Sequence, residues 1–293
     1  MRISDLLKIP EPSFSFEFFP PRTDDGVKAL FDTVGALRPL EPAFVSITYG
    51  AGGSTRARTI ELVRRIKSEL SVETMAHLTC VGATRDEIGA VLDQLRDSGI
   101  ENVLCLRGDP PKGQAAFVPV DGGFSYASEL ATYARAGWPF CLGVAGYPER
   151  HPECADRYTD LLHLKQKVDA GASFVVSQMF FENSYYFEFV AQARRLGITV
   201  PIIPGIMPIT NAEQVERITS LCGATIPDRL RRELGLRRND ASATLEFGVA
   251  YATLQCADLL RNGAPGIHFY TLNKSSATRA ILAALRANSP WRR

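Results

Sequence analysis

The segment FVVSQMFF, residues 174–181, is apolar at almost every position. A strand with one face in solvent alternates polar and apolar residues, whereas a strand covered on both faces is apolar nearly throughout. The segment therefore predicts a buried parallel strand. Comparable runs recur along the whole chain, and the predicted strands are 14–19, 43–49, 73–79, 102–107, 140–147, 174–180, 201–207 and 266–272.

Segments with helical periodicity separate these runs. The predicted helices are 24–37, 56–70, 85–98, 126–136, 157–170, 184–196, 212–221 and 276–287. Regular alternation implies parallel strands joined by right-handed crossovers, and eight such units favour a closed barrel over an open sheet. We therefore predict an α/β fold, a single (β/α)8 TIM barrel formed by one domain over residues 1–293. Residues 226–261 are expected to form an extra helical insertion before the eighth strand.

The composition is that of a globular protein. Of the 293 residues, 45% are hydrophobic and 22% are charged. The 33 basic and 32 acidic residues leave a net charge of +1, which provides no overall field to attract nucleic acid or an anionic membrane. We therefore expect neither as a partner. A small-molecule substrate and a homo-oligomer are expected instead.

The six cysteines contain no CxxC pair, and several lie within apolar runs. They are therefore interpreted as reduced structural residues. No apolar run approaches the ~18 residues that a membrane-spanning helix needs, so a cytoplasmic location is predicted. His151, Glu153 and Cys154 lie close together but match no known metal-ligand spacing, and no metal site is predicted.

The active site of such a barrel lies at the carboxyl ends of the strands. Glu17, in the segment FSFEFF, is flanked by phenylalanines on both sides. If its side chain faces the barrel interior, burial should raise the pKa of its carboxyl group towards neutrality, as a general acid requires. The alternative is a structural glutamate paired with an arginine in the core.

Arg107, Gly108 and Asp109 follow the fourth predicted strand. Arg107 could contact a phosphate or a ring carbonyl, and Asp109 could accept a hydrogen bond from a ligand amine. The alternative is a local salt bridge. The segment GAGGST, residues 50–55, lacks the third glycine of a dinucleotide-binding loop and the GK[ST] of a P-loop, so it is weak evidence for a phosphate site.

Nine motifs, read together, resemble the methylenetetrahydrofolate reductase family, in its compact bacterial form. They follow the family's order, and most lie at predicted strand ends. The motifs are FSFEFFPPRT (14–23), FVSITYGAGG (44–53), AHLTC (76–80), LRGDPP (106–111), YPERHPE (147–153), KQKVDAGA (165–172), SQMFF (177–181), IIPGIMP (202–208) and HFYTLNKS (268–275).

The resemblance implies a barrel that binds FAD and transfers a hydride from NADH, or from NADPH, to 5,10-methylenetetrahydrofolate in a ping-pong cycle. It also implies two catalytic residues. Glu17 would protonate the folate and help to open its five-membered ring. Asp109 would lie near flavin and folate, where its negative charge would favour hydride donation.

The resemblance assigns the remaining site residues motif by motif. The implied cofactor contacts are Thr48, Tyr49, Ala51, His77, Arg107, Gly108, Asp109, Tyr126, Ala127, Tyr147, His151, Asp160, His163, Gln166 and Lys167. The implied substrate contacts are Glu17, Asp109, Gln178, Gln214 and Lys274. Gln178 would serve nicotinamide and folate in turn.

Three positions depart from the pattern of enterobacterial members of the family. His163 and Gln166 stand where those proteins have asparagine and arginine, and Lys274 stands where they have arginine. Two other function classes stay open at this point. One is a flavin-free barrel methyltransferase that binds a pterin or folate, and the other is a non-catalytic folate-binding barrel.

Overall fold

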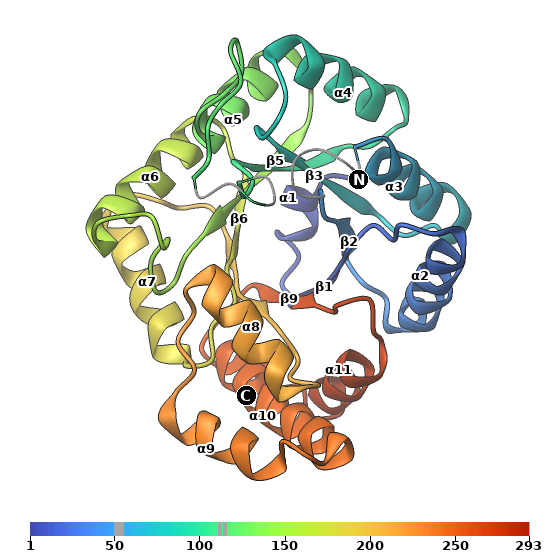
Figure 1. The fold of residues 1–293 in the computed structure, drawn as a ribbon, viewed down its shortest axis with the longest axis vertical. Coiled ribbons are helices and arrows are strands. Elements are labelled where there is room, and N and C mark those ends of the chain that lie inside the picture. The colour runs from blue at the N-terminus through green and yellow to red at the C-terminus, as the bar shows by residue number, and fades with distance from the viewer. Residues whose placement is uncertain (50–55, 111–112, 114–115, 293) are drawn as a thin grey trace.

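The computed structural model describes residues 1–49, 56–110, 113 and 116–292. Its nine strands form one parallel sheet in the order β7-β6-β5-β4-β3-β2-β1-β9-β8. Figure 1 shows these strands curled into a barrel with helices around the outside. The strands are β1 Ser13–Phe18, β2 Phe44–Ile47, β3 Thr74–Thr79, β4 Asn102–Leu106, β5 Cys141–Gly146, β6 Phe174–Ser177, β7 Ile202–Ile203, β8 Gly205–Ile206 and β9 Gly266–Tyr270. The predicted barrel is confirmed.

The seventh predicted strand is divided in two. β7 pairs with β6, whereas β8 pairs with β9, so the segment 202–206 contacts both edges of the sheet and brings the barrel close to closure. Pro204 lies between the two strands and has no N–H to donate to a ladder. Its carbonyl accepts a hydrogen bond from the backbone N–H of His268 at 2.9 Å. The proline therefore marks the point where the segment changes partner.

The helices match the predicted segments closely. They are α2 Asp24–Leu37, α3 Arg56–Leu70, α4 Arg85–Asp97, α5 Ala127–Gly137, α6 Arg157–Asp169, α7 Asn183–Arg195, α8 Ala212–Cys222 and α11 Ser276–Asn288. Local sequence determines where several begin. Thr84 and Glu87, for example, form a capping box at the start of α4.

The predicted insertion consists of two helices, α9 Asp228–Arg237 and α10 Ala241–Arg261. Figure 1 shows α8, α9 and α10 gathered at one side of the barrel. A separate apolar cluster joins them to the segments after β6 and β8, with Met179, Met207, Val215, Ile226 and Leu230 among its members. None of the described helices is long and apolar enough to cross a membrane.

A short helix that the sequence analysis did not predict, α1 Ile3–Leu6, lies inside the ring of strands in Figure 1. Ile3 is fully buried, and its backbone N–H donates to Asn102 Oδ1 at 2.8 Å. It packs in one apolar cluster with Phe44, Met75 and Phe174. These residues lie near the amino ends of their strands, so α1 closes that end of the barrel.

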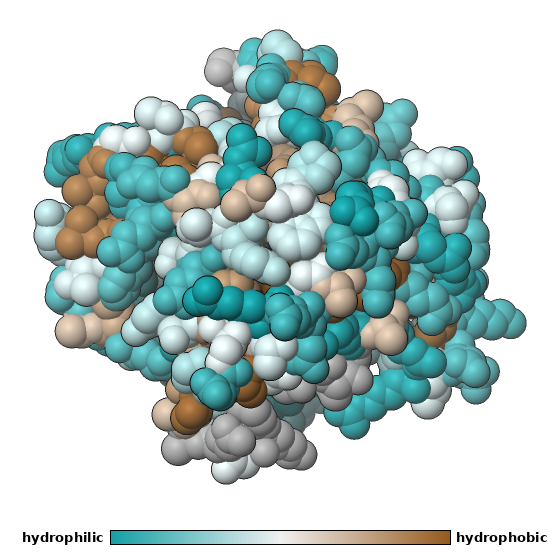
Figure 2. Space-filling model, turned by 90° about the horizontal axis from the view of Figure 1, so that it is seen from above, coloured by the Kyte–Doolittle hydropathy of each residue, from teal (hydrophilic) through white to brown (hydrophobic). Residues whose placement is uncertain are grey.

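The surface is mostly hydrophilic on the face drawn in Figure 2, where hydrophobic residues form separate patches. The largest apolar core instead lies between the sheet and its helices, and Phe16, Leu62, Val103 and Phe269 belong to it. Apolar burial at roughly 25 cal/mol per Å² is the main stabilising contribution of such a core.

Candidate active site

A cluster of buried polar side chains occupies the barrel interior towards the carboxyl ends of the strands. Glu17 on β1 is 9% exposed. Its Oε2 lies 3.3 Å from Nε2 of His268 on β9 and 3.4 Å from Nε2 of His77 on β3. The second ring nitrogen of His268, Nδ1, lies 2.8 Å from Ser15 Oγ. Alternation along the strands places all four side chains on the inner face.

The pKa of Glu17 differs from the sequence-based expectation. Burial alone would raise it, but the imidazoles of His77 and His268 beside the carboxylate lower it below its ordinary value. Burial in turn lowers the pKa of His77, and the nearby Glu17 only partly offsets this. The expected rise towards neutrality is therefore wrong for this structure. Glu17 is a carboxylate at neutral pH, and it must gain a proton before it can act as an acid.

Hydrogen bonds from Thr271 and Tyr270, at the carboxyl end of β9, fix the backbone around Glu17 and Ser177. Thr271 Oγ1 donates to the backbone carbonyl of Glu17 at 2.6 Å. Tyr270, which stands opposite Glu17 in the strand register, donates its hydroxyl to the carbonyl of Ser177 at 2.7 Å. Burial and the charge of Glu17 raise the pKa of Tyr270 well above its ordinary value, so this phenol stays a hydrogen-bond donor.

Several buried polar atoms around Glu17 lack a hydrogen-bond partner within the described part of the chain. They include Ser46 Oγ and Thr79 Oγ1, and also His77 Nε2, which makes no aligned hydrogen bond even though it lies 3.4 Å from Glu17 Oε2. Most buried polar atoms in proteins have a partner, so each exception calls for an explanation. These atoms belong to β2 and β3, and a polar ligand could provide the missing partners.

Arg107 supplies a cation after β4. Its Nη1 and Nη2 each donate to one carboxylate oxygen of Glu153 at 2.6 Å, and its guanidinium lies 5.1 Å from the ring centroid of Phe117. Gly108 follows with a φ of +90°, and a Cβ there would lie 2.9 Å from Val81 Cγ1. Glycine is therefore required for the turn that carries Arg107 and Asp109.

A second cluster of polar side chains surrounds Tyr147, which follows β5. Its ring makes an edge contact with His151 at 4.7 Å between centroids. The backbone N–H of His151 donates to Asp160 Oδ2 at 2.9 Å. Burial raises the pKa of Tyr147, and the charges of Asp109 and Asp160 raise it further, so both acids lie near this phenol.

Lys167 on α6 provides a further cation. Its Nζ donates to the carbonyl of Ala145 on β5 at 2.6 Å. Burial lowers the pKa of Lys167 to about 8, although the charge of Asp160 acts in the opposite direction. The ammonium group is therefore mainly protonated at neutral pH but sensitive to modest alkalinity.

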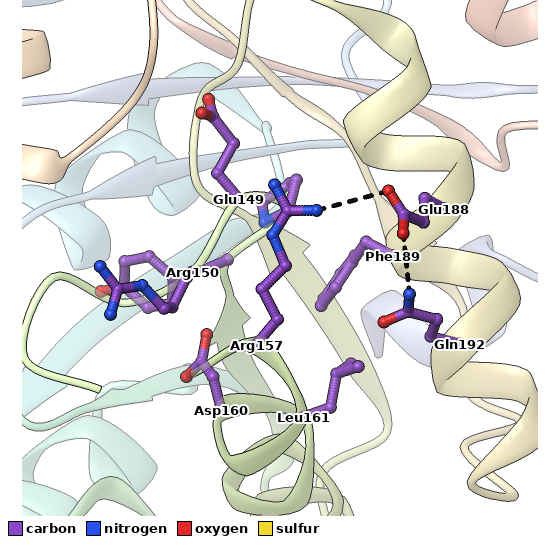
Figure 3. Close-up of a pocket in the computed structure, with 10 residues that line it drawn as sticks. Glu149, Arg150, Arg157, Asp160, Leu161, Glu188, Phe189 and Gln192 are labelled. Carbon is purple, nitrogen blue, oxygen red and sulfur yellow. Dashed lines mark hydrogen bonds and ion pairs between the residues drawn. The ribbon is translucent and has the colours of Figure 1, made fainter. Parts of the chain in front are cut away.

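Two small pockets lie on either side of residues 147–150. The first, about 240 Å³, lies between the start of α6 and α7 and is drawn in Figure 3, where Arg157 points towards Glu188. The second, about 170 Å³, is lined by Gln178, Met179 and Cys222 among others. The side chain of Gln178 is held in place because its Oε1 accepts a hydrogen bond from the backbone N–H of Met179 at 2.8 Å. Both volumes include open solvent, and each pocket is far smaller than a typical ligand site.

The other predicted residues lie at varied depths. Thr48 and Tyr49 are half-buried after β2, and Tyr49 Oη accepts from Arg56 Nε at 2.5 Å. Gln214 is half-buried near the start of α8, and Ala127 is half-buried at the start of α5. Exposed side chains are those of Asp109, Tyr126, His163, Gln166 and Lys274. Ala51 and the rest of the segment 50–55 lie outside the described residues.

The structure thus brings together two sets of predicted residues. Glu17 and His77 meet inside the barrel. Tyr147, His151 and Asp160 contact one another in sequence after β5, and Lys167 bonds the backbone of β5 beside them. Gln166 and Lys274 are exposed and make no side-chain hydrogen bond to either set within the described chain.

Sequence reasoning missed His268, Ser15 as its partner, and Glu153 as the partner of Arg107. His268 stands two residues before Tyr270 on β9 and opposite Ser15 in the register. Period-two alternation along the HFYTLN motif could have placed it on the inner face with Tyr270.

The family model described as methylenetetrahydrofolate reductase matches residues 2–286. The chain is 40% identical to "Methylenetetrahydrofolate reductase (NADH) 1" of Arabidopsis thaliana, an alignment that covers 100% of the chain and 52% of that protein. It is 38% identical to "5,10-methylenetetrahydrofolate reductase" of Escherichia coli, over 92% of the chain and 90% of that protein.

The chain spans about half the length of the plant relatives that it matches. A solved structure supports the fold independently. An uncharacterized protein from Clostridium thermocellum, described as binding two copies of 5-methyl-5,6,7,8-tetrahydrofolic acid, aligns with a TM-score of 0.66 at 16% identity and covers 99% of both chains. At this identity the likeness concerns the fold alone.

Proposed function

Because the chain belongs to the methylenetetrahydrofolate reductase family, we propose that it reduces 5,10-methylenetetrahydrofolate to 5-methyltetrahydrofolate with NADH or NADPH as the reductant. The names of the Arabidopsis and Escherichia coli relatives support this activity. The observation that carries the proposal is Glu17, a buried carboxylate at the open end of the barrel within 3.4 Å of two imidazoles.

FAD is the proposed cofactor, and when bound it would carry the hydride from the nicotinamide to the folate. The donor chemistry of the site fits such a group. Arg107 and Lys167 are cations suited to its diphosphate, and Thr79 Oγ1, which has no partner among the described residues, could bond a polar atom of its ring. The remaining proposed cofactor contacts are Thr48, Tyr49, Ala51, His77, Gly108, Asp109, Tyr126, Ala127, Tyr147, His151, Asp160, His163 and Gln166.

Glu17 has the proposed role of proton donor to the folate. Since its pKa is lowered in this structure, the carboxylate has to gain a proton before it can donate one. His268 Nε2, at 3.3 Å, is close enough to pass one on, and Ser15 Oγ holds the opposite ring nitrogen. A bound folate that excludes water would also favour the neutral carboxyl, because desolvation disfavours its charged form.

Asp109 and Gln178 have the proposed role of positioning the folate, together with Gln214 and Lys274. Asp109 can accept a hydrogen bond from a pterin amine, and its charge would disfavour negative charge nearby. Gln178 lies in the pocket beside Tyr147. If nicotinamide and folate both use Gln178, they cannot bind at once, and the two substrates must alternate.

Anaerobic half-reactions test the proposal. The purified chain, loaded with FAD, is mixed with NADH and then with 5,10-methylenetetrahydrofolate while flavin absorbance is followed. Bleaching followed by reoxidation, with 5-methyltetrahydrofolate as product, is expected. A chain that binds folate but neither binds nor reduces flavin would instead indicate the methyltransferase alternative. Folate binding without any turnover would indicate a binding protein.

We also propose the domain organisation, the assembly and the location of the chain. One catalytic domain over residues 1–293, a homo-oligomeric assembly and a cytoplasmic location stay predictions from the sequence. Size-exclusion chromatography with light scattering would measure the assembly directly.

A further inference from the structure

The two segments that leave the barrel after β1 and β9 are tied together by one side chain. Asn273 Oδ1 accepts a hydrogen bond from the backbone N–H of Phe19 at 2.8 Å, and Asn273 Nδ2 donates to the backbone carbonyl of Phe19 at 2.9 Å. A carboxamide offers the same kinds of donor and acceptor as a peptide bond. Since the register of the two strands ends at Glu17 and Tyr270, Asn273 extends their pairing to Phe19.

The turn that carries Asn273 has an unusual backbone. Leu272 has a φ of +53° and Asn273 has a φ of +60°, in the left-handed region that residues other than glycine rarely adopt. The backbone N–H of Asn273 donates to Thr271 Oγ1 at 3.2 Å, and this hydroxyl donates to the carbonyl of Glu17. Strained backbone of this kind persists where surrounding contacts hold it, and it concentrates at functional sites. The clamp between Asn273 and Phe19 is one of those contacts.

The clamp holds Phe19 at the carboxyl end of the barrel. Phe19 lies two residues after Glu17, so period-two alternation continues the inner face of β1 to its side chain. Phe19 is 48% exposed, and it belongs to none of the three apolar clusters that the described residues form. Its backbone is therefore fixed, while its ring is not used to pack the core.

The chemistry along this edge of the barrel matches a folate. Such a molecule joins a polar pterin through an aromatic p-aminobenzoyl ring to a glutamate with negatively charged carboxylates. From the inside outward the chain offers the buried carboxyl group of Glu17, the partly exposed ring of Phe19 and the exposed ammonium group of Lys274. Aromatic rings stack favourably on one another, and an ammonium group binds carboxylates. The same order of groups therefore occurs in the chain and in the substrate.

We propose that Asn273 is a positioning residue for folate binding, because it holds the ring of Phe19 where the aromatic part of the substrate leaves the barrel. Phe19 contacts the substrate, and Asn273 acts through Phe19. The role depends on the proposed reduction of 5,10-methylenetetrahydrofolate. Since it concerns how tightly the folate binds and not the proton transfer from Glu17, a loss of the clamp should change folate saturation and leave the limiting rate as it is.

Anaerobic reoxidation of the reduced, FAD-loaded chain at a series of 5,10-methylenetetrahydrofolate concentrations tests this role. Phe19→Ala and Asn273→Gly should each raise the half-saturating folate concentration by roughly tenfold, the contribution expected of an aromatic contact, with no change in the limiting rate. Glycine adopts the left-handed backbone of residue 273 without strain, so this variant removes only the amide. Flavin reduction by NADH should be unaffected in both variants.

A double variant separates action through Phe19 from an independent effect. If Asn273 acts only by holding Phe19, the chain with both substitutions should saturate like Phe19→Ala alone, and the two effects should not multiply. Asn273→Asp keeps the acceptor for the N–H of Phe19 but loses the donor to its carbonyl, so a smaller rise is expected. This variant carries the test if the glycine variant does not fold.

Asn262→Gly is the matched control. Asn262 precedes β9, whereas Asn273 follows it, and Asn262 Nδ2 donates to the carbonyl of Asp258 at 2.9 Å. Both half-reactions should be normal in this variant. The role of Asn273 is overturned if either single variant saturates like the parent, if their effects multiply, or if reduction by NADH slows in parallel, as it would after a general structural defect. A parent chain that folate does not reoxidise would overturn the proposed function, and this role with it.

Discussion

At the amino ends of the strands the barrel interior is filled by Phe44, Met75 and Phe174 under the plug of α1, whereas at the carboxyl ends it holds Glu17, His77 and His268. Strand β3 contributes to both ends, with Met75 at the amino end and His77 at the carboxyl end. The side chains at the amino end pack as one apolar cluster. The carboxyl end instead contains charged groups, and some of its buried polar atoms have no partner among the described residues. The difference indicates that one end stabilises the fold and the other carries the chemistry.

The largest effect is expected at the carboxyl end. Glu17→Gln removes the proposed acid but keeps its size, so the reaction of reduced flavin with methylenetetrahydrofolate should slow by about 10²- to 10⁴-fold, the usual contribution of a general acid. Anaerobic stopped-flow absorbance measures this step. Flavin reduction by NADH in the same variant is the internal control and should persist. Reoxidation at the normal rate would rule out Glu17 as the acid.

Substitutions at the amino end should instead lower the stability of the fold. Phe174 is fully buried in the apolar cluster that fills the amino end of the barrel interior. Phe174→Ala leaves a cavity there and should lower the free energy of unfolding by about 3 to 5 kcal/mol. Urea denaturation measures this loss, and Phe174→Leu should lose clearly less. If the alanine variant stayed as stable as the parent while losing turnover, the division of roles between the two ends would be wrong.

A smaller effect is expected when a rise in pH removes the charge of Lys167 and so weakens FAD binding. Burial lowers the pKa of Lys167 to about 8, so its ammonium is mostly charged below pH 8 and mostly neutral above it. If it binds the flavin diphosphate, FAD affinity should be highest below pH 8 and fall as pH rises, by up to about tenfold between pH 8 and 9. Flavin fluorescence titrations at several pH values measure this. Lys167→Met should bind FAD weakly, and its affinity should not fall between pH 8 and 9. An equal fall in both proteins would exclude Lys167 as the cause.

The smallest expected effect concerns the unpartnered polar atoms. Thr79 Oγ1 is buried and has no partner among the residues that the structure describes, so Thr79→Val should stabilise the chain without ligands by about 1 kcal/mol. Thr59 is the matched control, because its Oγ1 donates to the carbonyl of Thr48 at 3.0 Å and Thr59→Val should cost about 1 kcal/mol. Thermal denaturation of both variants distinguishes them. Destabilisation by Thr79→Val would mean that its hydroxyl already has a partner.

Most of the barrel could be predicted because its signals are local. Apolar runs and helical periodicity marked nearly every strand and helix, and Thr84 with Glu87 marked the start of α4. The division of residues 201–207 into β7 and β8 was missed, although Pro204 stood in the run. Helix α1 was missed because four residues are too short for a periodic pattern.

The site was predictable only in part. Motifs placed Glu17 and His77 at strand ends, yet the direction of the Glu17 pKa shift was wrong. Its cause includes His268, which is separated from Glu17 by 251 positions along the chain.

The sequence by itself determined the order of strands and helices, the inner face of β1 and the family to which the chain belongs, because these depend on residue type and periodicity. Only the tertiary structure decided how Glu17 is charged, which polar atoms lack partners and which cation meets which acid. Barrel closure brings residues from opposite ends of the chain within 4 Å, and electrostatic energies depend on that distance and on burial rather than on position in the sequence.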